Sequence, residues 1–205
     1  MPARFHALVM VCLLPCAAAA QFLCALGSGA SAYKTSSDQR PTADALEITA
    51  RANASAKTVC ATNCPQVVLF RNATAPNLML IPAAGQAKIV YAPQAFTGVY
   101  DRYGDPGILA LLAHALGHAL DDAIGAAWIE RGWTPELRAD AWAGCILARS
   151  NLASTEGQAA LGALAEYPSP SHPIWNLRLP VIRSGYSHCG GAAPFGSSGG
   201  IGKSQ

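Results

Sequence analysis

The residues of this sequence best suited to chemistry are two histidines four positions apart. His114 and His118 lie in an apolar segment with helical periodicity, and residues at i and i+4 share one face of a helix. Two imidazoles on one face can bind the same Zn²⁺ ion, which in catalytic sites takes three protein ligands. The spacing also occurs by chance, but two buried imidazoles without partners would cost free energy. We therefore predict a zinc site rather than a histidine pair satisfied within the core.

The next predicted helix supplies carboxylates that could complete this site. Thr134 and Pro135 have the types expected at the start of a helix, and Glu136 in its first turn is the best candidate for a third zinc ligand. Asp140 lies one turn further along the same face, where it could accept the other N–H of a ligating histidine. Gly117 costs about 1 kcal/mol relative to alanine inside a helix. It therefore predicts the close approach of another backbone or of a substrate.

The two predicted metal helices resemble those of a known family. Residues 111–118 are similar to the HExxH helix of gluzincin metallopeptidases. Residues 136–140 are similar to the ExxxD helix of the CAAX prenyl protease and HtpX-like group. The resemblance covers roughly residues 67–185. It implies a zinc endopeptidase that acts on a peptide or protein substrate, with Zn²⁺ as its cofactor.

Further similarities to the same group concern residues around the predicted metal. His172, within Ser-His-Pro, and Arg178 resemble a segment whose His and Arg flank the active site. The resemblance implies that they stabilise the oxyanion or hold Glu136. Asn77 opens a segment that resembles the group's edge strand, along which a substrate chain would bind by β-augmentation.

One position departs from the family pattern. The family has glutamate directly after the first histidine, whereas this sequence has Ala115. That glutamate acts as general base and general acid, a contribution typically worth about 10²–10⁴-fold. We therefore expect zinc binding to survive and peptide hydrolysis to be slow or absent. Two interpretations stay open: an inactivating change in an exported peptidase, or a zinc-binding pseudopeptidase that serves the cell envelope as a binding or structural module.

The rest of the chain predicts the elements that position these residues. Three short apolar segments indicate a small, mainly antiparallel sheet, and proline and capping signals indicate several helices after it. We expect an α+β, zincin-like fold in which the sheet packs on a helical bundle that carries the metal helices. The predicted strands cover 67–70, 77–81 and 87–91, and the predicted helices 93–103, 105–120, 136–149 and 154–166, with a last helix from Ser171.

The N-terminal 32 residues have the composition of a signal peptide or N-terminal anchor. Arg4 precedes an apolar stretch, and small residues at 18–20 and 30–32 both fit a cleavage site. Residues 7–26 just reach the ~20 needed to span a bilayer, so cleavage and anchoring both stay open. Any membrane association is predicted through this segment only. Residues 33–64 are expected to form a linker and N-terminal segment, 65–189 the zincin-like domain, and 190–205 a disordered Gly/Ser-rich tail.

The cysteines indicate the cellular compartment, and the charge content indicates which partners are excluded. Four cysteines lie outside the leader, and an even number in an exported domain suggests disulfides. The short loop between Cys60 and Cys64 favours that pair, which leaves Cys145 to pair with Cys189. We predict a periplasmic or secreted protein. The formal charge is +2 and no basic cluster occurs, which argues against nucleic-acid binding.

Overall fold

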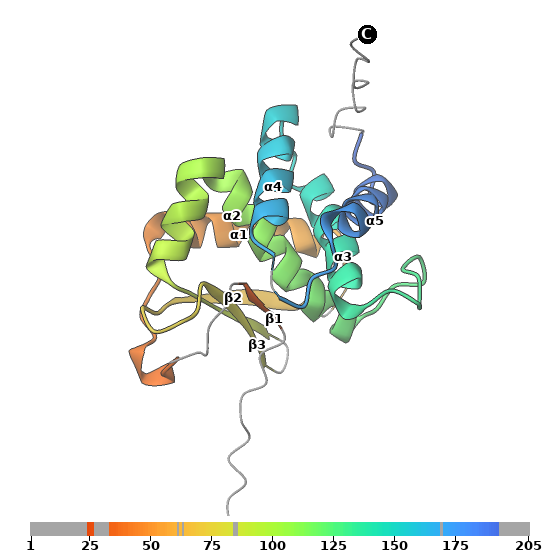
Figure 1. Cartoon of the computed structure of the whole chain (residues 1–205). Helices are drawn as coiled ribbons and strands as arrows, with labels where there is room; N and C mark the ends of the chain where they lie inside the picture. The colour runs from red at the N-terminus through yellow and green to blue at the C-terminus, as the bar shows by residue number, and fades with distance from the viewer. Residues whose placement is uncertain are drawn as a thin grey trace, which may run out of the picture.

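Helices cover one face of a small sheet (Figure 1) in this computed structural model, which describes residues 24–26, 33–60, 62, 64–83, 86–168 and 170–192. The predicted α+β class is confirmed. Within the described residues, no helix is both long and apolar enough to cross a membrane. The predicted signal peptide or anchor, apart from residues 24–26, and the predicted tail beyond residue 192 lie outside the described residues. The helices are α1 (Ala43–Lys57), α2 (Pro93–Ala123), α3 (Pro135–Arg149), α4 (Ser154–Glu166) and α5 (Trp175–His188); the strands are β1 (Cys24–Leu26), β2 (Gln66–Arg71), β3 (Leu78–Ala83) and β4 (Gln86–Tyr91), with a 3-10 turn η1 at Thr35–Ser37.

The sheet is mixed, with strand order β1-β3-β4-β2. β3 and β4 form the antiparallel hairpin that their spacing predicted, but β2 lies on the far side of β4 and runs parallel to it. After β2 the chain therefore does not form a hairpin with β3. It leaves a gap between β2 and β3 that β4 later fills. Asn72 holds the chain in place directly after β2. Its backbone N–H donates to the Tyr91 carbonyl at 2.9 Å, and its side-chain amide donates to the Asp38 carboxylate at 2.7 Å.

The predicted substrate edge at Asn77 differs from expectation. Asn77 is not part of a strand but precedes β3 with φ 46°, in the left-handed region that asparagine tolerates better than most residues. Its carbonyl accepts the Ala92 N–H at 2.6 Å. β3 itself lies between β4 and β1, and Leu26 of β1 pairs with Leu78. In the structure, the outer side of β3 is therefore paired with the chain's own N-terminal segment.

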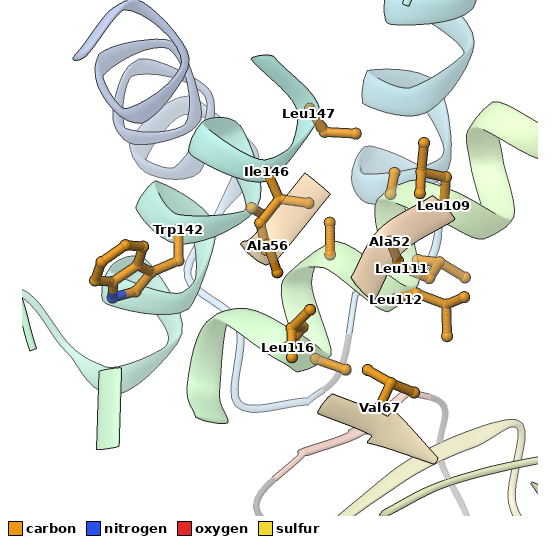
Figure 2. Close-up of a cluster of buried hydrophobic side chains, with 14 of the residues drawn as sticks. Ala52, Ala56, Val67, Leu109, Leu111, Leu112, Leu116, Trp142, Ile146 and Leu147 are labelled. Carbon is orange, nitrogen blue, oxygen red and sulfur yellow. The ribbon is translucent and has the colours of Figure 1, made fainter. Parts of the chain in front are cut away.

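Helix α2 contains the break that the sequence predicted between two helices. Gly104 has φ 61° and ψ −160°, and the following half of α2 is buried almost throughout because it passes through the centre of the fold. Figure 2 shows its leucines meeting α1, α3 and strand β2 in one core. The labelled members are Ala52, Ala56, Val67, Leu109, Leu111, Leu112, Leu116, Trp142, Ile146 and Leu147.

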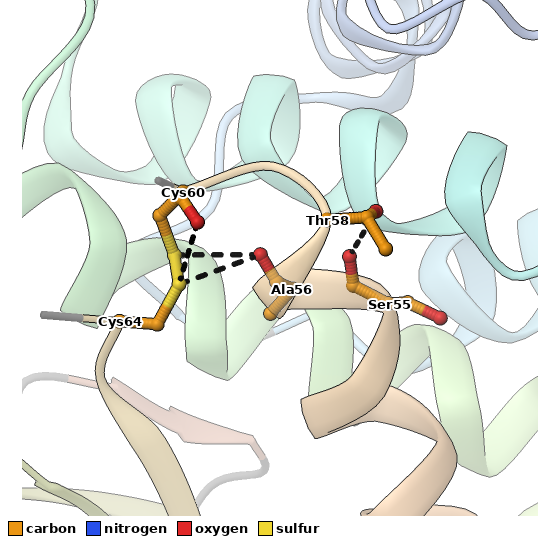
Figure 3. The surroundings of a disulfide bond; sticks show 5 residues. All are labelled: Ser55, Ala56, Thr58, Cys60 and Cys64. Carbon is orange, nitrogen blue, oxygen red and sulfur yellow. Dashed lines mark hydrogen bonds between the residues drawn. A yellow bond between two sulfur atoms is a disulfide. The ribbon is translucent and has the colours of Figure 1, made fainter. Parts of the chain in front are cut away.

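Two disulfides join the four cysteines outside the predicted leader, in the predicted pairing. Cys60–Cys64 closes the turn after α1, where both sulfur atoms lie near the Ala56 carbonyl oxygen, at 3.4 and 3.7 Å (Figure 3). Cys145–Cys189 ties the middle of α3 to the end of α5. Both pairs indicate an oxidising environment.

Helices α3 and α5 touch backbone to backbone at two glycines. A Cβ at Gly144 would overlap the Ile182 carbonyl oxygen, and one at Gly185 would overlap the carbonyl oxygen of Ala141. The absence of a side chain at both positions therefore sets how closely the two helices pack.

We expect Gly185→Ala to lower the free energy of unfolding by about 1–3 kcal/mol or more, because a backbone carbonyl cannot move aside as a side chain can. Gly132→Ala is the matched control, since nothing lies within 4 Å of a Cβ there, and it should change stability by less than about 0.5 kcal/mol. The measurement is denaturant unfolding with the disulfides intact. Equal unfolding midpoints for the two variants would contradict this account of the crossing.

Candidate metal centre

Three histidine side chains meet at one carboxylate oxygen of Glu136. From Glu136 Oε2, the Nε2 atoms of His114 and His118 lie at 3.2 Å each, and that of His172 at 3.1 Å. His172 Nε2 also lies 2.9 Å from His114 Nε2. The ligand atoms of His114, Glu136 and His172 are all within 4.8 Å of one another, while His118 joins this group through Glu136. These four residues are called the His/Glu cluster below.

Three separate segments bring the cluster together. α2 presents His114 and His118 on one face, and Thr134 caps α3 by accepting the Leu137 N–H at 3.3 Å, which places Glu136 in the first turn. His172 comes from the segment just before α5. The predicted start of that last helix at Ser171 is wrong, because α5 begins at Trp175 with Ile174 as its N-cap.

Gly117 allows α2 and α3 to approach closely enough for the cluster to form. A Cβ at this position would overlap the carbonyl oxygen of Ala139, which lies on α3 between the two predicted carboxylates. Of the two explanations offered for this glycine, the close approach of another backbone is confirmed.

A buried ion pair fixes the orientation of His114. Asp140 Oδ1 lies 3.0 Å from His114 Nδ1, and Arg178 binds both oxygens of the same carboxylate, through Nε at 2.8 Å and Nη2 at 2.9 Å. The remaining nitrogen, Nη1, donates to the Leu164 carbonyl at 2.8 Å. Asp140 thus has the place predicted for it beside a ligating histidine. Arg178, predicted to flank the active site, acts on the cluster through Asp140.

Ser171 contacts the cluster, a position for which the sequence did not single it out. Its hydroxyl donates to Glu136 Oε1 at 2.5 Å, which leaves Oε2 directed at the three imidazoles. In the sequence, a serine before His-Pro is equally typical of a helix cap, so no signal separated the two roles.

The electrostatics of the cluster favour an ionised Glu136 and a neutral His172 imidazole. Burial raises the pKa of the Glu136 carboxyl, but hydrogen bonds from the three histidines and Ser171 outweigh it and hold that pKa far below its usual range. Burial raises the pKa of Asp140 too, and the hydrogen bonds from Arg178 reverse the direction. Burial lowers the pKa of His172 despite the hydrogen bond to Glu136.

The hydrogen positions show why a cation fits among these residues. A carboxylate can only accept, so His114 Nδ1 must carry the proton that faces Asp140. In a neutral imidazole this leaves Nε2 with a lone pair, and that lone pair faces the Glu136 oxygen at 3.2 Å. Two acceptors face each other there, which calls for either an additional proton or a metal ion between them. A histidine that donates its other N–H to a carboxylate is the usual arrangement of a metal ligand.

Two of the predicted site residues are not members of this cluster. Ala115 is fully buried and belongs to the hydrophobic core. Asn77 lines a cavity of about 210 Å³ together with Leu78, Phe96 and Tyr167, and no member of the His/Glu cluster lines that cavity. The structure therefore brings together the predicted ligands, Asp140, His172 and Arg178, but not the residue predicted to bind substrate.

No protein family matches this chain, and no curated protein or solved structure matches it either. The resemblance to gluzincin metallopeptidases thus depends on the quoted residues alone.

Proposed function

We propose that this chain is an exported zinc-binding protein of metallopeptidase type that, as it stands, hydrolyses peptide bonds slowly or not at all. The observation that supports it best is the convergence of three imidazole nitrogens within 3.2 Å of one Glu136 oxygen. Imidazole nitrogens and a carboxylate oxygen are typical zinc donors. The two disulfides agree with a periplasmic or secreted location, after cleavage or retention of the N-terminal segment.

Each residue has a definite part in this proposal. His114, His118 and Glu136 would hold the ion, and Ser171 directs Glu136 by binding its other oxygen. Asp140 keeps the Nδ1 proton of His114 in place, and Arg178 holds Asp140. Bound zinc supplies Lewis acidity, which activates water and polarises carbonyl groups. Ala115 offers no group that could move a proton, so this chain lacks the general base of a peptidase.

The active-peptidase interpretation shares these residues and differs only at position 115. In that interpretation the site binds a peptide or protein substrate, and Ala115 is an inactivating change. The full burial of Ala115 among apolar side chains favours the alternative, a zinc-binding pseudopeptidase that acts as a binding or structural module. Alanine is well accommodated there, whereas a buried carboxylate would need partners.

The purified protein is expected to contain about one zinc per chain, as a site built from one set of ligands requires. His118→Ala should lose most of this zinc on dialysis, while His188→Ala should retain it, because His188 lies at the exposed end of α5. Metal analysis measures both. Removing zinc with a chelator should lower the thermal midpoint, since a ligand that binds only the folded state stabilises it. Metal-free protein after refolding in excess zinc would refute the site.

A further inference from the structure

We infer that His172 is a fourth protein ligand, so that the zinc site is closed. This inference rests on the proposed zinc site and extends it from three ligands to four. The resemblance assigned His172 to the oxyanion or to Glu136, both of which leave a coordination position free. The geometry of the His/Glu cluster points to direct ligation.

The separations around Glu136 Oε2, and the one between His172 and His114, are close to the edges of a tetrahedral site. Bonds of roughly 2.0–2.1 Å from zinc to nitrogen or oxygen require neighbouring donor atoms about 3.3–3.4 Å apart in a tetrahedral site. The three imidazole nitrogens lie 3.1–3.2 Å from Glu136 Oε2, and His172 Nε2 lies 2.9 Å from His114 Nε2. These four separations are slightly shorter than tetrahedral edges. His118 is not among the residues whose ligand atoms all lie within 4.8 Å of one another, so it has to move towards His114 and His172 for all four donors to surround one ion.

His172 is as close to the shared oxygen as either predicted ligand. Its Nε2 is 3.1 Å from Glu136 Oε2, compared with 3.2 Å for His114 and for His118. A residue that stabilises an oxyanion has to lie far enough from the metal for the substrate's carbonyl group to fit between them. His172 leaves no such gap between itself and His114.

Burial supports the same conclusion. The side chains of His114, His118, Glu136 and His172 are only 2%, 5%, 8% and 1% exposed. Pro173 restricts the backbone of His172 to extended conformations, and Ser171 on its other side is bonded to Glu136. The segment is therefore tied to the cluster through Ser171, and Pro173 limits the conformations that His172 can adopt.

A closed site also accounts for Ala115. Structural zinc sites have four protein ligands, whereas catalytic sites keep one position open. A general base at position 115 would have no water to act on if His172 filled that position. Ala115 and a fourth ligand at His172 are thus consistent with each other. In such a site the metal would hold helices α2 and α3 and the segment before α5 together.

The first test uses the unaltered, disulfide-bonded protein with Co²⁺ as a spectroscopic probe in place of zinc. We expect one equivalent of cobalt to give the intense visible absorption of a tetrahedral site, and we expect added azide to leave that spectrum unchanged. A spectrum that shifts on adding azide would overturn the assignment of His172, because the anion would then have found an open position. No cobalt or zinc binding at all would overturn the underlying zinc site as well, so the two failures are distinguishable.

The second test removes the proposed ligand. His172→Ala should weaken zinc binding by at least about 10–100-fold, the loss known for partners of ligands, as measured by competition with a chelator. Its cobalt spectrum should respond to azide, and free imidazole should restore the original spectrum by filling the vacated position. His188→Ala is the control with a histidine removed outside the cluster. Unchanged affinity in His172→Ala, with no response to azide or imidazole, would contradict ligation by His172.

Discussion

Ala115→Glu alone is expected to leave the chain without a gain in peptidase activity, whereas Ala115→Glu combined with His172→Ala should gain about 10²-fold or more, the range of general acid–base catalysis. A carboxylate at position 115 follows a ligand on the same helix and could take a proton from a water nucleophile. It can act only if a coordination position is free for that water. His172, whose Nε2 lies 3.1 Å from Glu136 Oε2, occupies the space from which the water would have to act.

The measurement is the rate of cleavage of a quenched peptide library and of casein, with zinc present. The matched control is Ala115→Gln combined with His172→Ala, which has the same size and no basic group, and it should show no gain. Because Ala115 is fully buried, each variant must first be shown to be folded and to hold zinc. A chelator-sensitive gain in Ala115→Glu alone would show that the original site is open and that His172 is not a ligand. A folded, zinc-loaded double variant that cleaves nothing would favour the binding-module interpretation over a disabled peptidase.

The helices that carry His114, His118 and Glu136 could be predicted because local signals specify their faces and the start of α3. The i, i+4 spacing places His114 and His118 on one face of α2, and the Thr134 cap with Pro135 fixes where α3 begins and hence where Glu136 and Asp140 lie. Gly117 predicted the close approach of another backbone or of a substrate, and the backbone of Ala139 lies there. Each of these inferences depends on a few neighbouring residues.

Features that depend on distant segments were predicted less well. Strands β2, β3 and β4 were predicted, whereas β1 lies in the predicted signal peptide or anchor and was not. Nothing near β2 indicates that β4 rather than β3 would be its neighbour. Asn77 was interpreted as part of an edge strand, whereas its left-handed backbone ends the preceding turn. The distance of His172 from Glu136 depends on how α5 packs on α3, and the sequence pattern does not carry that information. A histidine that binds the metal and one that only lies near it would occur in the same sequence motif.

Arg178→Ala is expected to lower the free energy of unfolding by about 3–5 kcal/mol, the usual cost of removing one partner from a buried ion pair. Arg178 is only 1% exposed, and Asp140 is fully buried. Without the guanidinium, Asp140 would keep a charge in the interior that only His114 contacts. The Leu164 carbonyl would lose its donor too. Denaturant unfolding of the zinc-free protein with its disulfides intact measures the effect separately from metal binding.

Two further variants show whether this loss belongs to the ion pair or merely to a shortened side chain. Arg183→Ala removes an exposed arginine from the same helix and should change stability by less than about 0.5 kcal/mol. Arg178→Lys keeps the charge but cannot bind both carboxylate oxygens with a planar fork, so it should fall between the two. The zinc affinity of Arg178→Ala should also drop, because Asp140 would no longer be held against Nδ1 of His114. If Arg178→Ala unfolded at the same midpoint as Arg183→Ala, Asp140 could not depend on Arg178, and the orientation of His114 would need another cause.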